Sequence, residues 1–187
     1  MYCYKTFTQI TDMGPYVTKL LLKLPTEAIG QRLATESLKI YTERKSAKTG
    51  EIILFKDLFH PEIPGAPAKG FQKAAKIYPG NDQGDYDAEG TWAVAEIEPD
   101  ALGKRTEGTM LSSEYVIHEY TITLTCQSPD KEAQSFIFDT CLGDVCPQKK
   151  GWCQSVMTSG DILLKYAYFT PENISGQIPL VIWLHGA

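Results

Sequence analysis

The segment from Val116 to Cys126 constrains the fold most strongly, because mostly apolar residues alternate there with polar ones. A β-strand points successive side chains to opposite faces, so this alternation predicts a strand with one buried and one solvated face. His118 and Tyr120 fall on the buried face, and Glu119 falls on the solvated one. We therefore expect His118 to be a core or interface histidine and not a metal ligand.

Other short segments carry strand patterns and are separated by clusters of Gly, Pro, Asn or Asp. Within one of them, Leu20 and Leu22 share a face while Leu21 shares the other face with lysines, which predicts a half-buried strand. About seven short strands with frequent turns are typical of an antiparallel β-sandwich. The further predicted strands are Val17–Leu24, Leu38–Arg44, Glu51–Phe55, Ala74–Tyr78, Trp92–Ile97 and Ser135–Asp139.

The run from Leu180 to Leu184 differs from these strands because it is apolar on both faces. That pattern predicts a central parallel strand covered by helices on each side. Such a strand needs neighbouring strands and crossover helices, and the 187 residues supply none after it. We expect an N-terminal domain followed by the first strands of a second domain.

Two stretches, Asp161–Pro171 and Pro179–Ala187, resemble the opening of the α/β-hydrolase domain in bacterial serine esterases. The preceding part is similar to the immunoglobulin-like domain that some of these esterases carry at their N-terminus. The resemblance implies a mainly β fold, with an immunoglobulin-like antiparallel β-sandwich over residues 1–145. Residues 146–187 would then be a junction and the first strands of an incomplete α/β-hydrolase domain.

By the same resemblance, Gly186 and Ala187 begin an oxyanion loop, and His185 has a structural role beside them. Backbone N–H groups in such a loop stabilise the oxyanion that forms during acyl transfer. The complete enzyme would be a serine carboxylesterase that cleaves acyl esters through a Ser-His-Asp triad, with no cofactor and no metal. No G-x-S-x-G sequence is present, so no catalytic residue is assigned and the chain alone is expected to be inactive. The implied partners are the missing C-terminal catalytic domain, a small acyl ester and a second copy of the chain.

Two alternatives compete with this interpretation. The C-terminal strand would also suit another α/β fold, such as a nucleotide-binding one. The chain could instead be a free-standing immunoglobulin-like module for binding or adhesion, with Leu180–Leu184 pairing antiparallel inside the sandwich.

Composition excludes several classes of function. The net charge is −5 and no run of four or more Lys or Arg occurs, which argues against binding to nucleic acid or an anionic membrane. No apolar stretch reaches the roughly 18 residues of a spanning helix. The first fifteen residues lack a secretory leader, which leaves the compartment open, with an extracytoplasmic or secreted location favoured over the cytoplasm.

Two further motifs have ordinary explanations. Cys141, Cys146 and Cys153 could contain one disulfide, but five cysteines in total leave at least one thiol unpaired. Residues 85–96 partly match the template of a calcium loop. Pro79 and Gly80 before the loop and a strand after it exclude the flanking helices, so we expect an acidic, solvated hairpin loop.

Overall fold

The computed structural model describes residues 1–11, 14–52, 69–105, 113–128, 131–172, 175–177 and 181–182. The chain divides into two compact units, Met1–Cys146 and Pro147–Ala187. The prediction of a mainly β protein is confirmed, and no helix in the described part is long and apolar enough to cross a bilayer. The described residues include three single-turn 3-10 helices, at Thr26–Ala28, Thr35–Ser37 and Pro147–Lys149.

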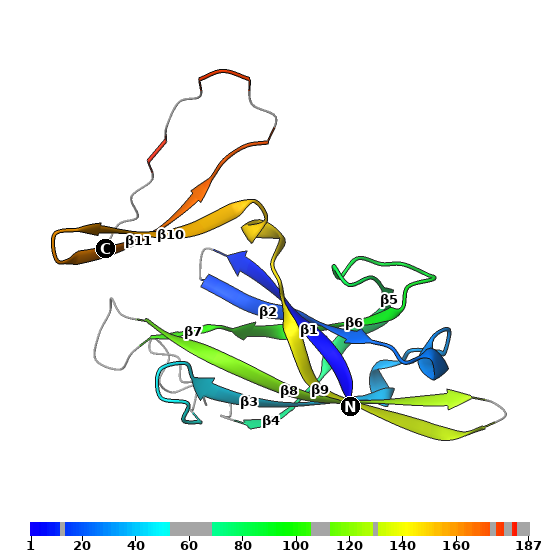
Figure 1. Ribbon diagram of the computed structural model, residues 1–187. Helices are drawn as coiled ribbons and strands as arrows, with labels where there is room; N and C mark the ends of the chain where they lie inside the picture. The colour runs from blue at the N-terminus through cyan, green and yellow to red at the C-terminus, as the bar shows by residue number, and fades with distance from the viewer. Residues whose placement is uncertain are drawn as a thin grey trace. The chain divides into compact units, whose positions relative to one another are not determined.

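The first unit is one sheet of nine described strands (Figure 1). Its neighbours follow the order β4-β3-β8-β9-β1-β2-β6-β5, and β7 pairs with β8 beside this path. The pairing of β1 with β9 is parallel, and the other described pairings are antiparallel. The strands are β1 (Tyr2–Thr11), β2 (Gly14–Lys23), β3 (Leu38–Ser46), β4 (Lys69–Gln72), β5 (Ala74–Gly80), β6 (Trp92–Ala101), β7 (Gly103–Arg105), β8 (Ser113–Ser128) and β9 (Lys131–Val145).

The sheet curls so that its two halves bury one core between them. The predicted face of β8 is confirmed, because Tyr120, Ile122 and Leu124 are almost fully buried. They pack in one cluster with side chains of β2 and β6, which lie on the far side of β9 and β1 in the sheet order. The core also includes Tyr4, Val17, Leu20, Leu22, Ile40, Ala93, Ala95, Phe136 and Phe138.

Strand β2 is buried on both faces where we expected a half-buried strand. Leu20 and Leu22 point into the main core, and Leu21 on the opposite face is also fully buried. Leu21 packs with Trp92 and Val94 of β6, and Phe7 of β1 lies against the same small cluster. The three consecutive leucines therefore mark a strand that is covered on both sides.

The loop after β5 is the acidic hairpin loop that the sequence predicts. Asn81 Oδ1 accepts hydrogen bonds from the backbone N–H groups of Gln83 (2.9 Å) and Asp85 (3.0 Å). Gly84 has a φ of +86°, and a Cβ there would lie 3.0 Å from the Phe7 ring, so glycine lets the loop pack against the small cluster. Among the described residues, no group of three or more His, Cys, Asp or Glu could hold a metal ion.

Several strand boundaries differ from the expectation. Strand β1 was not predicted, although it lies near the middle of the sheet, between β9 and β2. Strand β9 continues to Val145, well past Asp139, where the predicted strand ends. Of the predicted strand Glu51–Phe55, only Glu51 and Ile52 lie within the described residues, and Ile52 forms an isolated bridge with Lys45.

The second unit contains an antiparallel hairpin of β10 (Trp152–Ser159) and β11 (Ile162–Phe169). Eight residue pairs are in register, from Trp152 opposite Phe169 to Ser159 opposite Ile162. Of the predicted strand Leu180–Leu184, only Val181 and Ile182 are described. Neither lies in a strand, and their exposed fractions are 81% and 72%, so these two residues do not show the expected buried strand.

A matched pair of substitutions in β9 tests the position of the core. Phe138 is fully buried beside Tyr2, whereas Ile137, the preceding residue, is 51% exposed. We expect Phe138→Ala to lower the free energy of unfolding by about 3–5 kcal/mol through lost burial and a residual cavity. Ile137→Ala is expected to cost less than about 1 kcal/mol. Urea unfolding of both variants measures the difference, and equal losses would contradict this assignment of the core face.

Candidate functional site

Asp100 is the buried acidic residue around which polar side chains converge. It lies near the end of β6, opposite Val17 of β2, and is only 8% exposed. The β2–β6 register shifts between Val17 and Lys19, which places extra residues in β6, including Pro99. This irregularity interrupts the inward and outward alternation and turns the Asp100 carboxylate into the interior.

Arg44 of β3 forms the ion pair with Asp100. Its Nε donates to Asp100 Oδ1 at 3.0 Å, and its Nη2 donates to Oδ1 and Oδ2, each at 2.9 Å. Both side chains are 9% exposed. A guanidinium that approaches a carboxylate with two nitrogens makes a strong, oriented contact, and here it joins two strands that are not neighbours in the sheet.

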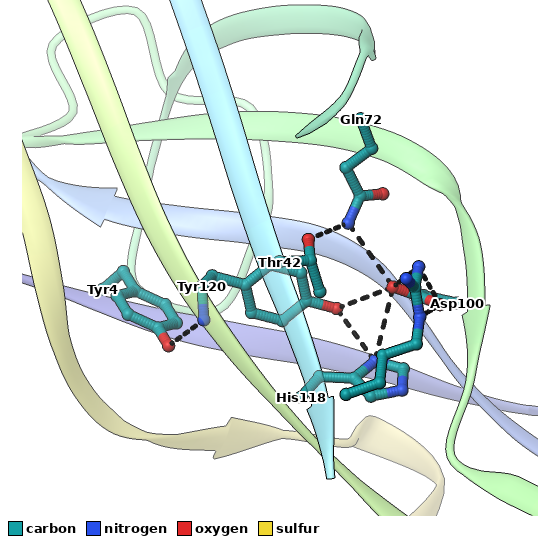
Figure 2. A network of polar contacts seen from close by, with 7 residues as sticks. Tyr4, Thr42, Gln72, Asp100, His118 and Tyr120 are labelled. Atoms are coloured by element: carbon teal, nitrogen blue, oxygen red, sulfur yellow. Dashed lines mark hydrogen bonds and ion pairs between the residues drawn. The ribbon is translucent and has the colours of Figure 1, made fainter. Parts of the chain in front are cut away.

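Three other residues complete the Asp100 cluster, defined here as Arg44, Gln72, Asp100, His118 and Tyr120 (Figure 2). Gln72 of β4 donates to Asp100 Oδ2 at 3.4 Å and also contacts the hydroxyl of Thr42. The Tyr120 hydroxyl of β8 donates to the same Oδ2 at 3.4 Å. The carboxylate thus links β6 with β3, β4 and β8.

The two tyrosines at this end of the core remain protonated. Burial, followed by the nearby negative charge of Asp100, raises the pKa of Tyr120 well above its usual value. Burial also raises the pKa of Tyr4 to about 12, although its hydroxyl accepts a hydrogen bond from the backbone N–H of Tyr120 at 3.1 Å. Both phenols therefore act as neutral hydrogen-bonding groups at neutral pH.

His118 is the titratable base of the Asp100 cluster. Its Nδ1 lies 3.1 Å from the Tyr120 hydroxyl and 3.4 Å from Asp100 Oδ2, and its side chain is 1% exposed. Its Nε2 is buried and has no hydrogen-bond partner within the described part of the chain. Burial lowers the pKa of His118, Asp100 opposes this effect, and the positive charge of Arg44 adds to it.

Among the described residues, this arrangement has the features of a structural clasp. A His–Asp pair contributes to acyl transfer when the other ring nitrogen faces a nucleophile. Here Nε2 faces no serine or cysteine partner among the described residues, and the nearby Tyr120 phenol holds its proton tightly. The chemistry that the cluster supports is pairing of buried charges, which joins the two halves of the sheet.

The structure describes some of the residues that the sequence analysis singled out and not others. His118 lies on the buried face, as expected, and the structure brings it to the Asp100 cluster. The predicted oxyanion-loop residues Gly186 and Ala187, with His185, lie outside the described residues. All five cysteines are described, and they are free thiols.

Arg44, Gln72 and Asp100 were not predicted as site residues from the sequence. The burial of Arg44 could have been predicted from the sequence, because residues 38, 40, 42, 44 and 46 share the inward face of β3. An arginine at an inward position requires a buried partner, which predicts a carboxylate opposite it. No comparable signal identifies Asp100, because the irregular pairing of β6 decides where its side chain points.

Comparison with known proteins gives a structural relative but no sequence relative. No protein-family model matches the chain, and no curated protein matches it. Among solved structures, the chain is similar to the crystal structure of a thermostable esterase, with a TM-score of 0.64 and 13% sequence identity. The match covers 92% of this chain and 43% of the esterase chain. At this identity the similarity shows a shared fold alone, and the chain spans less than half the length of that esterase.

The buried ion pair makes a prediction about stability. Asp100→Asn removes the charge that balances buried Arg44, so we expect it to lower the free energy of unfolding by about 3–5 kcal/mol. Asp82→Asn is the control, because it breaks a 2.8 Å pair with Lys5 at a site where the aspartate side chain is 47% exposed. Its effect should be much smaller. Urea unfolding at pH 7.5 compares the two, and a similar loss in both would contradict the role of Asp100 as a clasp.

Proposed function

We propose that this chain is the non-catalytic N-terminal portion of a serine carboxylesterase that hydrolyses carboxylic acyl esters. The fold similarity to the thermostable esterase carries this proposal. The similarity covers 92% of the chain, which is more than the first unit contains, so it extends into the second unit. The part of that esterase which this chain does not match leaves room for the catalytic domain that the proposal requires.

In this proposal, residues 1–145 form an immunoglobulin-like β-sandwich. The curled sheet supports this assignment because its two halves face each other across one core, as the layers of a sandwich do. Residues 146–187 would be the junction and first strands of an α/β-hydrolase domain. Gly186 and Ala187 would open the oxyanion loop, with His185 structural beside them.

The surface of the β10–β11 hairpin gives independent support. Large apolar side chains are exposed on both of its faces: Trp152 and Phe169 lie opposite each other on one face, and Met157 and Leu164 on the other. Their exposed fractions are between 45% and 54%. An isolated two-stranded hairpin is marginally stable in water, and exposed apolar patches mark interaction sites. Both faces therefore fit an element that further layers of a hydrolase domain would cover.

A labelling experiment tests the proposal. A fluorophosphonate reacts with the activated serine of serine hydrolases, because it phosphonylates the nucleophile. An antibody raised against the first unit should capture from native cells a protein heavier than 20.8 kDa that the fluorophosphonate labels. The purified 187-residue chain should remain unlabelled and should not hydrolyse p-nitrophenyl butyrate above the buffer rate, because it lacks the nucleophile.

Two results would overturn this assignment. Capture of an unlabelled 20.8 kDa protein would favour the free-standing binding or adhesion module. Labelling of the purified chain would show a nucleophile within these residues, and alanine variants of Ser155, Ser159 and Ser175 would then locate it.

A further inference from the structure

We propose that the Asp100 cluster is a proton-operated clasp, in which protonation of His118 releases β3 and β4 from Asp100 and opens the curled sheet at this end. The proposal concerns regulation of the first unit and does not depend on the esterase assignment. In the sheet order, β8, β9, β1 and β2 separate β3 from β6. The Arg44–Asp100 contact joins β3 to the end of β6 through side chains. Beside it, Leu102 O accepts a hydrogen bond from Val116 N–H at 2.9 Å and β7 pairs with β8, so the backbone links at this end run between β8 and the segment that follows β6.

The charge balance of the cluster is the first reason. With His118 neutral, one buried cation, Arg44, faces one buried anion, Asp100, at 2.9 Å. A proton on His118 places a second cation against the same carboxylate, 3.4 Å from Asp100 Oδ2. Two cations then lie against the same carboxylate in an interior where water does not screen their repulsion.

The hydrogen bonds of Asp100 are the second reason. Its Oδ2 already accepts from Arg44, Gln72 and Tyr120. A protonated His118 would compete for this oxygen through Nδ1. Its Nε2, which has no hydrogen-bond partner among the described residues in the closed form, would also carry a buried N–H. The backbone carbonyl of Ala101 acts on the imidazole in the opposite sense, because it favours the protonated ring. Opening the cluster to water satisfies both N–H groups and separates His118 from Arg44.

The groups that face His118 come from three strands. They are Arg44 of β3, Asp100 and the backbone carbonyl of Ala101 in β6, and Tyr120 of its own strand β8. Glu119 and Lys45 are close in sequence to His118 and Arg44, but they form a separate 2.6 Å pair at the surface. Among the described residues, Asp100 is thus the anion that would compensate a charged His118.

The sign of the pH effect follows from the burial of His118. Because burial holds its pKa in the folded protein below the ordinary value of 6.5, the open form binds the proton more readily. The closed clasp is fully stable above pH 6.5. Its stability falls as the pH decreases from there and levels off below the pKa of the folded protein.

Nuclear magnetic resonance of the full chain tests the first step. The chain has three histidines, so three imidazole C2–H signals titrate, and His118→Gln identifies one of them by its loss. We expect the His118 signal to titrate below pH 6.5. A midpoint at or above 6.5 would overturn the proposal. Sequential assignment of the unmodified chain gives the same answer if the variant does not fold.

Amide hydrogen exchange at pH 7.5 and pH 5.0 tests the opening itself. After correction for intrinsic rates, protection of amides in β3 and β6 near Arg44 and Asp100 should fall at the lower pH. The expected fall is about tenfold for each pKa unit by which folded His118 lies below 6.5, up to a limit of about thirtyfold at pH 5.0. Amides that pair β1 with β2 should change less, and His118→Gln should abolish the difference. A uniform loss of protection across the sheet, or the same loss in His118→Gln, would overturn the clasp.

Discussion

The buried contact between Arg44 and Asp100 is the interaction on which the curled shape of the first unit depends. Two ionised groups that are 9% exposed are stable only when they pair with each other and with further hydrogen-bonding groups. Gln72 and Tyr120 supply those groups, so strands β3, β4, β6 and β8 must meet at one place. The ion pair contributes specificity, since a sheet that curled differently would leave both charges buried without a partner.

Burial of apolar side chains drives folding of the first unit, and the Arg44–Asp100 contact determines how its sheet curls. Strand β2 is central because Leu20 and Leu22 fill the main core while Leu21 fills the small cluster behind it. Cation–aromatic contacts cover that second face, with Lys19 Nζ 5.1 Å from the ring centre of Phe7 and Lys5 Nζ 5.1 Å from that of Trp92. The first unit thus buries its own apolar surface on both sides of β2. The β10–β11 hairpin leaves comparable side chains exposed, and this contrast supports its assignment to a larger domain.

Features that depend on residues close together in the sequence were easier to predict than features that depend on contacts between distant strands. Alternation within Val116–Cys126 identified β8 and the buried position of His118, because the period of a strand is a local property of the chain. Strand β1 was missed because its polarity does not alternate cleanly: Thr6 and Thr8 lie on the inward face, and the apolar Phe7 lies on the other. The burial of Leu21 was also missed, because its cover comes from Trp92, Val94 and Phe7, which are distant in the sequence or on another strand.

The sequence by itself determined that the chain is rich in β-strands, which face of β8 is buried and that the loop after β5 is a solvated hairpin loop. Each of these follows from side-chain periodicity or from local turn residues. The tertiary structure alone decided that β1 and β9 pair in parallel and that Arg44, Gln72, His118 and Tyr120 surround Asp100. Such long-range contacts join residues as many as 138 positions apart, as with Thr6 and Asp144, and only the closing of the sheet brings these residues within hydrogen-bond distance.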